Sequence, residues 1–225
     1  MPAILTPDIF RVVEHLARAL PPADSGFEIN DAIRWQETVE PPVDADDFAS
    51  ETVFVICNSG MKHTVARQIY NRVYQALTEG SSSATVFGHA GKTAAIDAIW
   101  RCRHELYDKF TALDADAEKL EFLAALPWIG AITKYHLAKN FGVDVAKPDV
   151  HLQRLASADG RPVHIMCTEL AAETGYRIAT VDLILWFACA RGVIDSRAPE
   201  PFAPFLPTNA ASPAAPFVET SERAP

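Results

Sequence analysis

One aspartate in this chain stands where its type and its neighbours suit it to chemistry on a sugar. Asp149 follows Lys147-Pro148 and precedes an apolar-periodic run, so we expect it to be the N-cap of a helix that extends to about Ala158. A fixed carboxylate stabilises an oxocarbenium-like sugar and can orient or deprotonate the water that attacks it. An N-glycosidic bond breaks through such a sugar cation. We therefore interpret Asp149 as a catalytic carboxylate, and the alternative is that it only caps its helix.

A short turn upstream of Asp149 has the features of a phosphate-binding site. The run Pro-Trp-Ile-Gly at 127–130 joins two helical segments into a hairpin over 120–142, and Gly142 stands where a helix C-cap belongs. A turn that leads into a helix N-terminus exposes unpaired N–H groups and the positive end of the helix dipole, and both favour a phosphate. An ordinary corner between two helices is the alternative. The predicted contacts are the backbone of Ile129, Gly130, Ala131, Ile132 and Thr133, with Lys134 as a nearby cation.

The hairpin and the aspartate together resemble the helix-hairpin-helix (HhH-GPD) superfamily of DNA glycosylases. The run Leu-Pro-Trp-Ile-Gly at 126–130 is similar to that family's Leu-Pro-Gly-Ile/Val-Gly hairpin, and Asp149 follows Gly130 by 19 residues, as the essential aspartate follows the second glycine in the family. The similarity is strongest over residues 121–156 and weaker over 50–195. It implies an all-α, two-lobed helical domain with a cleft between the lobes, which excises a flipped damaged or modified base from double-stranded DNA without a cofactor.

The same resemblance separates two mechanisms at one position. Family members that form a Schiff base and then cleave the strand place a lysine two residues after the second hairpin glycine, and here that residue is Ile132. Lys134 lies two residues farther along, which on a helix is about 200° around the axis. The resemblance therefore implies a monofunctional enzyme without lyase activity, closer to the 3-methyladenine glycosylase II type than to the lyase members.

A third segment is similar to the family's wedge, which fills the gap left by a flipped nucleotide. The apolar run from Val53 to Cys57 ends in Asn58-Ser59-Gly60-Met61. The resemblance makes Asn58 and Met61 the candidates for the wedge. A helix break with a polar cap is the alternative.

Departures from the family pattern leave the substrate open. Trp128 replaces the first hairpin glycine, Lys134 replaces a small residue, and the wedge lacks the usual paired glutamines. Three other functions are therefore compatible with the sequence: a noncatalytic DNA-binding module, an enzyme that acts on phage-type hypermodified bases, and a helical interaction protein that uses its acidic N-terminal region.

The charge distribution permits DNA binding without indicating it. The formal net charge is −9, but residues 1–52 hold 3 Arg and Lys against 11 Asp and Glu, which is nearly the whole imbalance. Residues 53–110 hold 7 basic side chains against 4 acidic ones, and residues 126–156 hold 4 against 2. Phosphate neutralisation requires a positive surface, and these two segments, which contain the motifs, can supply one.

Helical periodicity dominates the chain and predicts three parts. A helix over 7–20 and an acidic loop with one short helix at most (residues 1–50) pack on a core. A helical domain spans 51–195, with one long or two shorter helices over 51–77 and others near 91–108, 116–125, 163–174 and 179–191. Because seven prolines lie among small and polar residues after Ala198, we expect residues 196–225 to be disordered.

The remaining titratable residues give weaker signals. His151 points away from Asp149 on a helix and is expected to pack or to face phosphate. Asp182, alone in an apolar helix, either lines a pocket or has a capping or paired structural role. The four cysteines and the histidines show no metal-ligand spacing, so no metal site is predicted. Because no leader or membrane segment is visible, we expect a cytoplasmic, monomeric protein.

Overall fold

The structure, a computed structural model, describes residues 4–22 and 28–206, and the regular secondary structure in this part of the chain is all helical. The predicted all-α fold class is therefore confirmed. Two 3-10 helices, η1 (Ser83–Thr85) and η2 (Ala203–Phe205), accompany the α-helices. The α-helices are α1 (Pro7–Arg18), α2 (Ile29–Thr38), α3 (Ala45–Asn58), α4 (His63–Thr78), α5 (Ala90–Arg101), α6 (Arg103–Thr111), α7 (Asp116–Ala124), α8 (Thr133–Asn140), α9 (Val150–Asp159), α10 (Val163–Thr174) and α11 (Ile178–Ala190).

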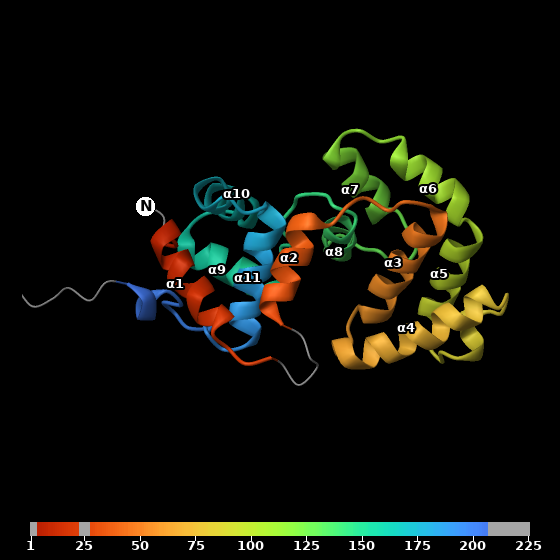
Figure 1. Cartoon of the computed structure of the whole chain (residues 1–225), viewed down its shortest axis with the longest axis horizontal. Coiled ribbons are helices and arrows are strands. Elements are labelled where there is room, and N and C mark those ends of the chain that lie inside the picture. Colours follow the sequence, from red (N-terminus) through yellow and green to blue (C-terminus); the bar gives the residue numbers. More distant parts are fainter. Residues whose placement is uncertain (1–3, 23–27, 207–225) are drawn as a thin grey trace, which may run out of the picture.

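The buried side chains form two hydrophobic clusters, which Figure 1 shows as two groups of helices. The first cluster, here the terminal lobe, draws on α1, α2, α9, α10 and α11. The second, the central lobe, draws on α3 to α8. The chain thus leaves the terminal lobe after α2 and returns to it at α9. This division differs from the expected parts 1–50 and 51–195, because the N-terminal helices share a core with the C-terminal ones.

The composition of α11 explains why the two ends of the chain meet. Its sequence, IATVDLILWFACA, is apolar around most of its circumference, and eight of its residues are buried. A helix that is apolar all round must be covered on several sides. Helices α1, α2, α9 and α10 all contact it. Covering α11 therefore recruits the N-terminal helices into the terminal lobe.

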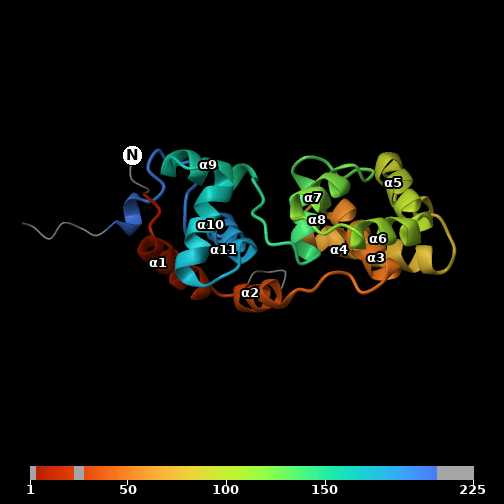
Figure 2. The same cartoon turned by 90° about the horizontal axis from the view of Figure 1, so that it is seen from above.

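Two segments without regular structure cross between the lobes, and Figure 2 shows both from above. They are residues 39–44, which join α2 to α3, and residues 141–149, which join α8 to α9. The two crossings touch at Gly142, where an added Cβ would lie 3.1 Å from the carbonyl oxygen of Val39. The sequence predicts Gly142 at the C-cap of α8, but the C-cap is Phe141, and Gly142 follows it in the left-handed conformation with φ +75°. The Arg177 guanidinium donates hydrogen bonds to the carbonyl oxygens of both Gln36 (3.0 Å) and Gly142.

A buried ion pair also joins the lobes. The Nζ of Lys139, in α8, contacts the Oδ2 of Asp182, in α11, and both residues are buried. The same Oδ2 accepts a hydrogen bond of 2.9 Å from the backbone N–H of Lys147. Asp182 therefore has the paired structural role that was one of its two sequence interpretations. It holds α8 and the second crossing segment against α11.

Most helix positions agree with the sequence, and the exceptions have local causes. Region 51–77 forms two helices, which break at residues 59–62, and the expected helix over 91–108 is divided at Cys102. The acidic region 21–50 contains α2 and the start of α3. The Asp44 side chain caps α3 by accepting a hydrogen bond from the N–H of Asp47, so an acidic residue expected in a loop begins a helix.

The expected disordered tail, 196–225, lies partly within the described residues. Residues 196–206 include η2, and Phe202 is buried in the terminal lobe, so disorder does not begin at residue 196. Residues 207–225 lie outside the described part of the chain. None of the helices in the described ranges is long and apolar enough to cross a membrane.

The ion pair between the lobes gives a stability prediction. Lys139→Met leaves the buried Asp182 carboxylate without its cation, and breaking a buried pair on one side costs about 3–5 kcal/mol. We expect urea unfolding to show a decrease of that size, and Lys139→Met/Asp182→Leu to recover most of it. Lys109→Met, which removes an exposed pair with Glu105, is the matched control and should change stability by less than about 1 kcal/mol. Equal effects of the two single variants would contradict a structural role for the pair.

Candidate active site

Asp149 is the N-cap of α9, as the sequence predicts. Its Oδ1 accepts hydrogen bonds from the N–H groups of His151 (2.9 Å) and Leu152 (3.1 Å). The Oδ2 has no hydrogen-bond or ion-pair partner among the described residues. One oxygen therefore orients the carboxylate, and the other is available to a bound molecule. Capping and chemistry are compatible roles for this residue.

Lys147 lies beside Asp149 because the chain turns sharply at the proline between them. The N–H of Asp149 donates a hydrogen bond of 2.8 Å to the carbonyl oxygen of Lys147, which closes a three-residue turn. Burial lowers the pKa of the Lys147 ammonium, and the Asp149 carboxylate partly opposes that shift. The Lys147 Nζ has no hydrogen-bond or ion-pair partner in the described part of the chain. The sequence analysis did not select Lys147, although its spacing of two residues from Asp149 was a usable signal.

His136 is a second group at this site that the sequence analysis missed. It lies in α8, one helical turn after Ile132. Burial lowers its pKa to about 3, and the positive charges of Lys147 and Lys139 contribute to the shift. The imidazole is therefore neutral at neutral pH. Its position one helical turn after Ile132 could have been found from the helical repeat, but its partial burial and its closeness to Lys147 could not.

The electrostatic surroundings of Asp182 are consistent with its structural role. Burial raises the pKa of this carboxyl, while the Lys139 ammonium and the Lys147 N–H oppose the rise. Both interactions are made by Oδ2. Asp182 is thus bonded to two groups of the protein through Oδ2, whereas the Oδ2 of Asp149 has no partner among the described residues.

The turn between α7 and α8 presents backbone N–H groups at the surface. Ile129 is buried and anchors the turn in the central lobe, while Gly130, Ala131 and Ile132 are exposed. The N–H of Lys134 is the first to bond back into the turn, to the carbonyl oxygen of Gly130 at 3.0 Å. The N–H groups of residues 130–133 have no acceptor among the described residues. They are four of the five backbone donors that the sequence predicts for phosphate. The fifth, the N–H of Ile129, is bonded to the carbonyl oxygen of Leu126 at 3.1 Å.

The Lys134 side chain is engaged within the protein. Its Nζ forms an ion pair of 2.8 Å with Glu121 of α7. This pair links the two helices of the hairpin. Lys134 therefore stabilises the hairpin in this structure, and contact with a phosphate would require it to leave Glu121.

Trp128 adopts a backbone conformation that suits glycine. Its φ is +68°, and it is the only non-glycine residue with positive φ in the described ranges. Its Nε1 donates a hydrogen bond of 3.0 Å to the Ser59 Oγ, and its ring meets His89 edge to face, with centroids 5.1 Å apart. These contacts hold a conformation that is costly for a large side chain.

The candidate wedge residues lie in the turn between α3 and α4. Asn58 ends α3 and Met61 follows it in the turn, with the Met61 N–H bonded to the Asn58 carbonyl oxygen at 3.1 Å. Met61 is half-buried and packs against the core of the central lobe. The Lys92 ammonium fixes the same turn from α5, because it donates hydrogen bonds to the carbonyl oxygens of Cys57 (3.1 Å) and Ser59 (2.6 Å).

The structure therefore assembles the predicted residues into two groups. Trp128 joins the hairpin to the wedge turn through Ser59, and the turn at Pro148 joins Asp149 to Lys147. Helix α8 extends from the first group toward the second, because it starts at the hairpin and carries His136 and Lys139. His151 is outside both groups: its Nδ1 lies 3.0 Å from the Ser196 Oγ, in agreement with the packed role expected from the sequence.

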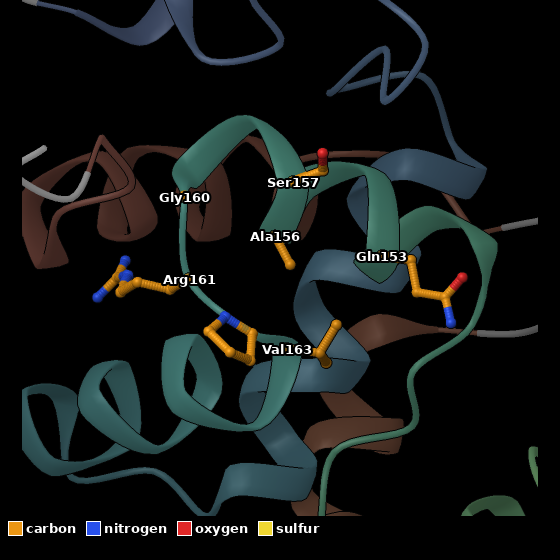
Figure 3. A pocket seen from close by; sticks show the side chains of 7 residues that line it. Gln153, Ala156, Ser157, Gly160, Arg161 and Val163 are labelled. Carbon is orange, nitrogen blue, oxygen red and sulfur yellow. The ribbon is translucent and has the colours of Figure 1, made fainter.

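Two pockets lie away from these groups. One, of about 430 Å³, is a groove at the far end of α9 from Asp149, and Figure 3 shows it between α9 and α10. Its cation, Arg161, already pairs with Asp159 and Glu169. The other, of about 880 Å³, lies between α1 and residues 199–206 and is mainly apolar. Neither contains a residue predicted to act in chemistry.

No metal centre accompanies the candidate site in the described residues, where no cluster of His, Cys, Asp and Glu could hold an ion. The four cysteines are free, with Cys57 and Cys167 buried and Cys102 exposed. In comparisons with known proteins, the chain matches no family model, no curated protein and no solved structure.

The strain at Trp128 predicts an unusual order of stabilities. Trp128→Ala loses the ring contacts and keeps a Cβ at positive φ, whereas Trp128→Gly loses the same contacts and relieves the backbone. We expect the glycine variant to be the more stable of the two by about 1 kcal/mol in urea unfolding. The reverse order would show that the turn relaxes to negative φ when the ring is removed.

Proposed function

We propose that this protein is a monofunctional DNA glycosylase that hydrolyses the N-glycosidic bond of a damaged or modified base extruded from double-stranded DNA. The observation that carries the proposal is the state of Asp149: two backbone N–H groups fix its Oδ1, and its Oδ2 is open. A carboxylate held in this way is prepared for a developing positive charge without reorganisation. The proposed protein acts as a monomer in the cytoplasm, and its four free cysteines suit a reducing compartment.

The hairpin supports the proposal by offering a place for the DNA backbone. Its free N–H groups at 130–133 are suited to a phosphate, and such contacts fix the position of the duplex without reading its sequence. The wedge turn with Asn58 and Met61 is fastened to the hairpin through the hydrogen bond from Trp128 to Ser59. A phosphate on the hairpin would thereby set the distance from the duplex to the turn that replaces the extruded base.

The chemistry follows from the open oxygen of Asp149. As the bond between C1′ and the base nitrogen breaks, its electron pair leaves with the base, and the sugar gains positive charge. The Asp149 carboxylate stabilises that charge and accepts a hydrogen bond from the water that attacks C1′. The water adds OH to C1′, and its proton is passed on to the released base. The products are an abasic site and a free base.

Replacing Asp149 by asparagine separates chemistry from capping. Asparagine is as good an N-cap as aspartate, so Asp149→Asn should fold normally while base release falls by about 10³-fold or more, as expected when a preorganised charge at the reacting centre is removed. The assay incubates the protein with DNA that contains alkylated, oxidised, deaminated and glucosylated bases and identifies released bases by mass spectrometry. Asp108→Asn, an exposed change in α6, is the matched control.

The outcomes of that assay distinguish the alternatives. If the wild-type protein releases a base and Asp149→Asn releases it equally well, Asp149 is not the catalytic residue. Salt-dependent DNA binding without release of any base would indicate a noncatalytic DNA-binding module. Release restricted to glucosylated bases would indicate an enzyme for phage-type hypermodified DNA. Absence of both binding and release would favour an interaction protein that uses its acidic N-terminal region.

The monofunctional mechanism needs a separate test, because a lysine other than the expected lyase lysine lies near the reacting carboxylate. Ile132 occupies the position of the lyase lysine, but Lys147 stands beside Asp149. We expect borohydride to trap no covalent adduct between the protein and DNA during base release. A trapped adduct that disappears in Lys147→Gln would contradict the monofunctional assignment and identify Lys147 as the nucleophile.

A further inference from the structure

Lys147 is the unpaired cation of the candidate active site. Lys139 is paired with Asp182, and Arg67 lies over the ring of Phe54, with its guanidinium carbon 4.4 Å from the ring centroid. Lys147 is partly buried and has neither a hydrogen bond nor an ion pair from its Nζ within the described ranges. The turn at Pro148 keeps Lys147 and Asp149 together along the chain. They supply one positive and one negative group, and neither the Lys147 Nζ nor the Asp149 Oδ2 has a hydrogen-bond or ion-pair partner within the described ranges.

We propose that Lys147 binds the departing base as that base becomes negatively charged, so that the substrate is a neutral base that leaves as an anion. This inference rests on the proposed glycosylase function and names the class of its substrate. When a neutral base leaves, the sugar gains positive charge and the base gains negative charge. The pair Asp149 and Lys147 has the signs that stabilise this separation, and groups that are oriented before the reaction contribute most.

The proton and electron balance of this step requires no further reactant. The electron pair of the broken bond moves to the base nitrogen, and an N–H of Lys147 donates a hydrogen bond to the anionic base. Water supplies OH to C1′, and its proton, accepted through Asp149, finally neutralises the base. Lys147 ends in its original state.

The neighbouring groups make this region unfavourable for an additional cation. Burial and the charges of Lys147, Lys139 and His63 all oppose protonation of His136. The nearby carboxylates are engaged: Asp182 by Lys139 and by the Lys147 N–H, and Glu51 by the Asn140 side-chain amide at 2.5 Å. Asp149 is left as the open carboxylate, and it is needed at the sugar.

This charge arrangement disfavours one class of substrate that the sequence resemblance suggests. Bases such as 3-methyladenine and 7-methylguanine carry a positive charge in DNA and lose it as they leave. An adjacent ammonium repels them in the ground state and, less strongly, in the transition state. Uracil, hypoxanthine and 8-oxoguanine are neutral in DNA and leave as anions. Lys147 should therefore assist the second class and hinder the first.

The experiment compares both classes in wild-type protein, Lys147→Gln and Lys109→Gln. The last is a matched control in α6 with the same loss of charge from an exposed pair. Duplexes carry one neutral modified base (uracil, hypoxanthine, 8-oxoguanine or glucosylated 5-hydroxymethylcytosine) or one cationic base (7-methylguanine or 3-methyladenine). Single-turnover release rates are measured at saturating protein. For neutral bases we expect release by wild type and a loss of about 10²-fold in Lys147→Gln, the size expected when one electrostatic donor is removed.

The release rates of the cationic bases show whether the role of Lys147 is electrostatic or merely structural. We expect wild type to release them more slowly than the neutral bases, and Lys147→Gln to leave their rate unchanged or to raise it. An equal loss in both classes, or faster release of the cationic bases by wild type, would overturn the inference while leaving the glycosylase function intact. Release of no base from any duplex would overturn the glycosylase function itself, and this inference with it.

Discussion

The contact between Lys139 and Asp182 is the constraint on which the candidate site depends. Lys139 lies in α8 of the central lobe and Asp182 in α11 of the terminal lobe, and each is buried. A buried charge without a partner is strongly unfavourable, so the two clusters keep the relative position in which this pair forms. The pair therefore does more than add to stability. It selects one arrangement of the lobes, and Arg177 reinforces that arrangement by donating hydrogen bonds to a carbonyl oxygen of each crossing segment, Val39 in the first and Gly142 in the second.

The same pair places the groups available for chemistry. Asp182 also accepts a hydrogen bond from the backbone N–H of Lys147. The carboxylate that pairs with Lys139 of α8 therefore also fixes the segment that leads to Asp149. Asp149 then caps α9 with one oxygen and leaves the other open. The ion pair between Lys139 and Asp182 thus lies next in the chain to two charged groups, Lys147 and Asp149. The pair satisfies its charges internally, whereas the Lys147 Nζ and the Asp149 Oδ2 have no hydrogen-bond or ion-pair partner among the described residues.

In the hairpin, side-chain contacts compensate for backbone strain at Trp128. Trp128 occupies a positive-φ position where glycine would be unstrained. The indole in return connects the hairpin to Ser59 and His89. A glycine would give a turn of the same shape without this connection. The tryptophan thus couples the predicted phosphate site to the predicted wedge turn.

Local features could be predicted from the sequence because they depend on neighbours along the chain. The helical repeat, the N-cap at Asp149 and the end of α8 next to Gly142 all agree with the structure, since helix ends and periodicity involve contacts a few residues apart. The partnership of α1 and α2 with α11, the burial of His136 and the pairing of Asp182 with Lys139 could not be predicted. They arise from packing between segments far apart in the chain, and the sequence shows an apolar face or a lone charge without showing what covers it. Local sequence is enough to predict the helices and the carboxylate that begins α9. Which charges are neutralised and which have no partner follows from the packing of the lobes, because burial and pairing depend on segments far apart in the chain.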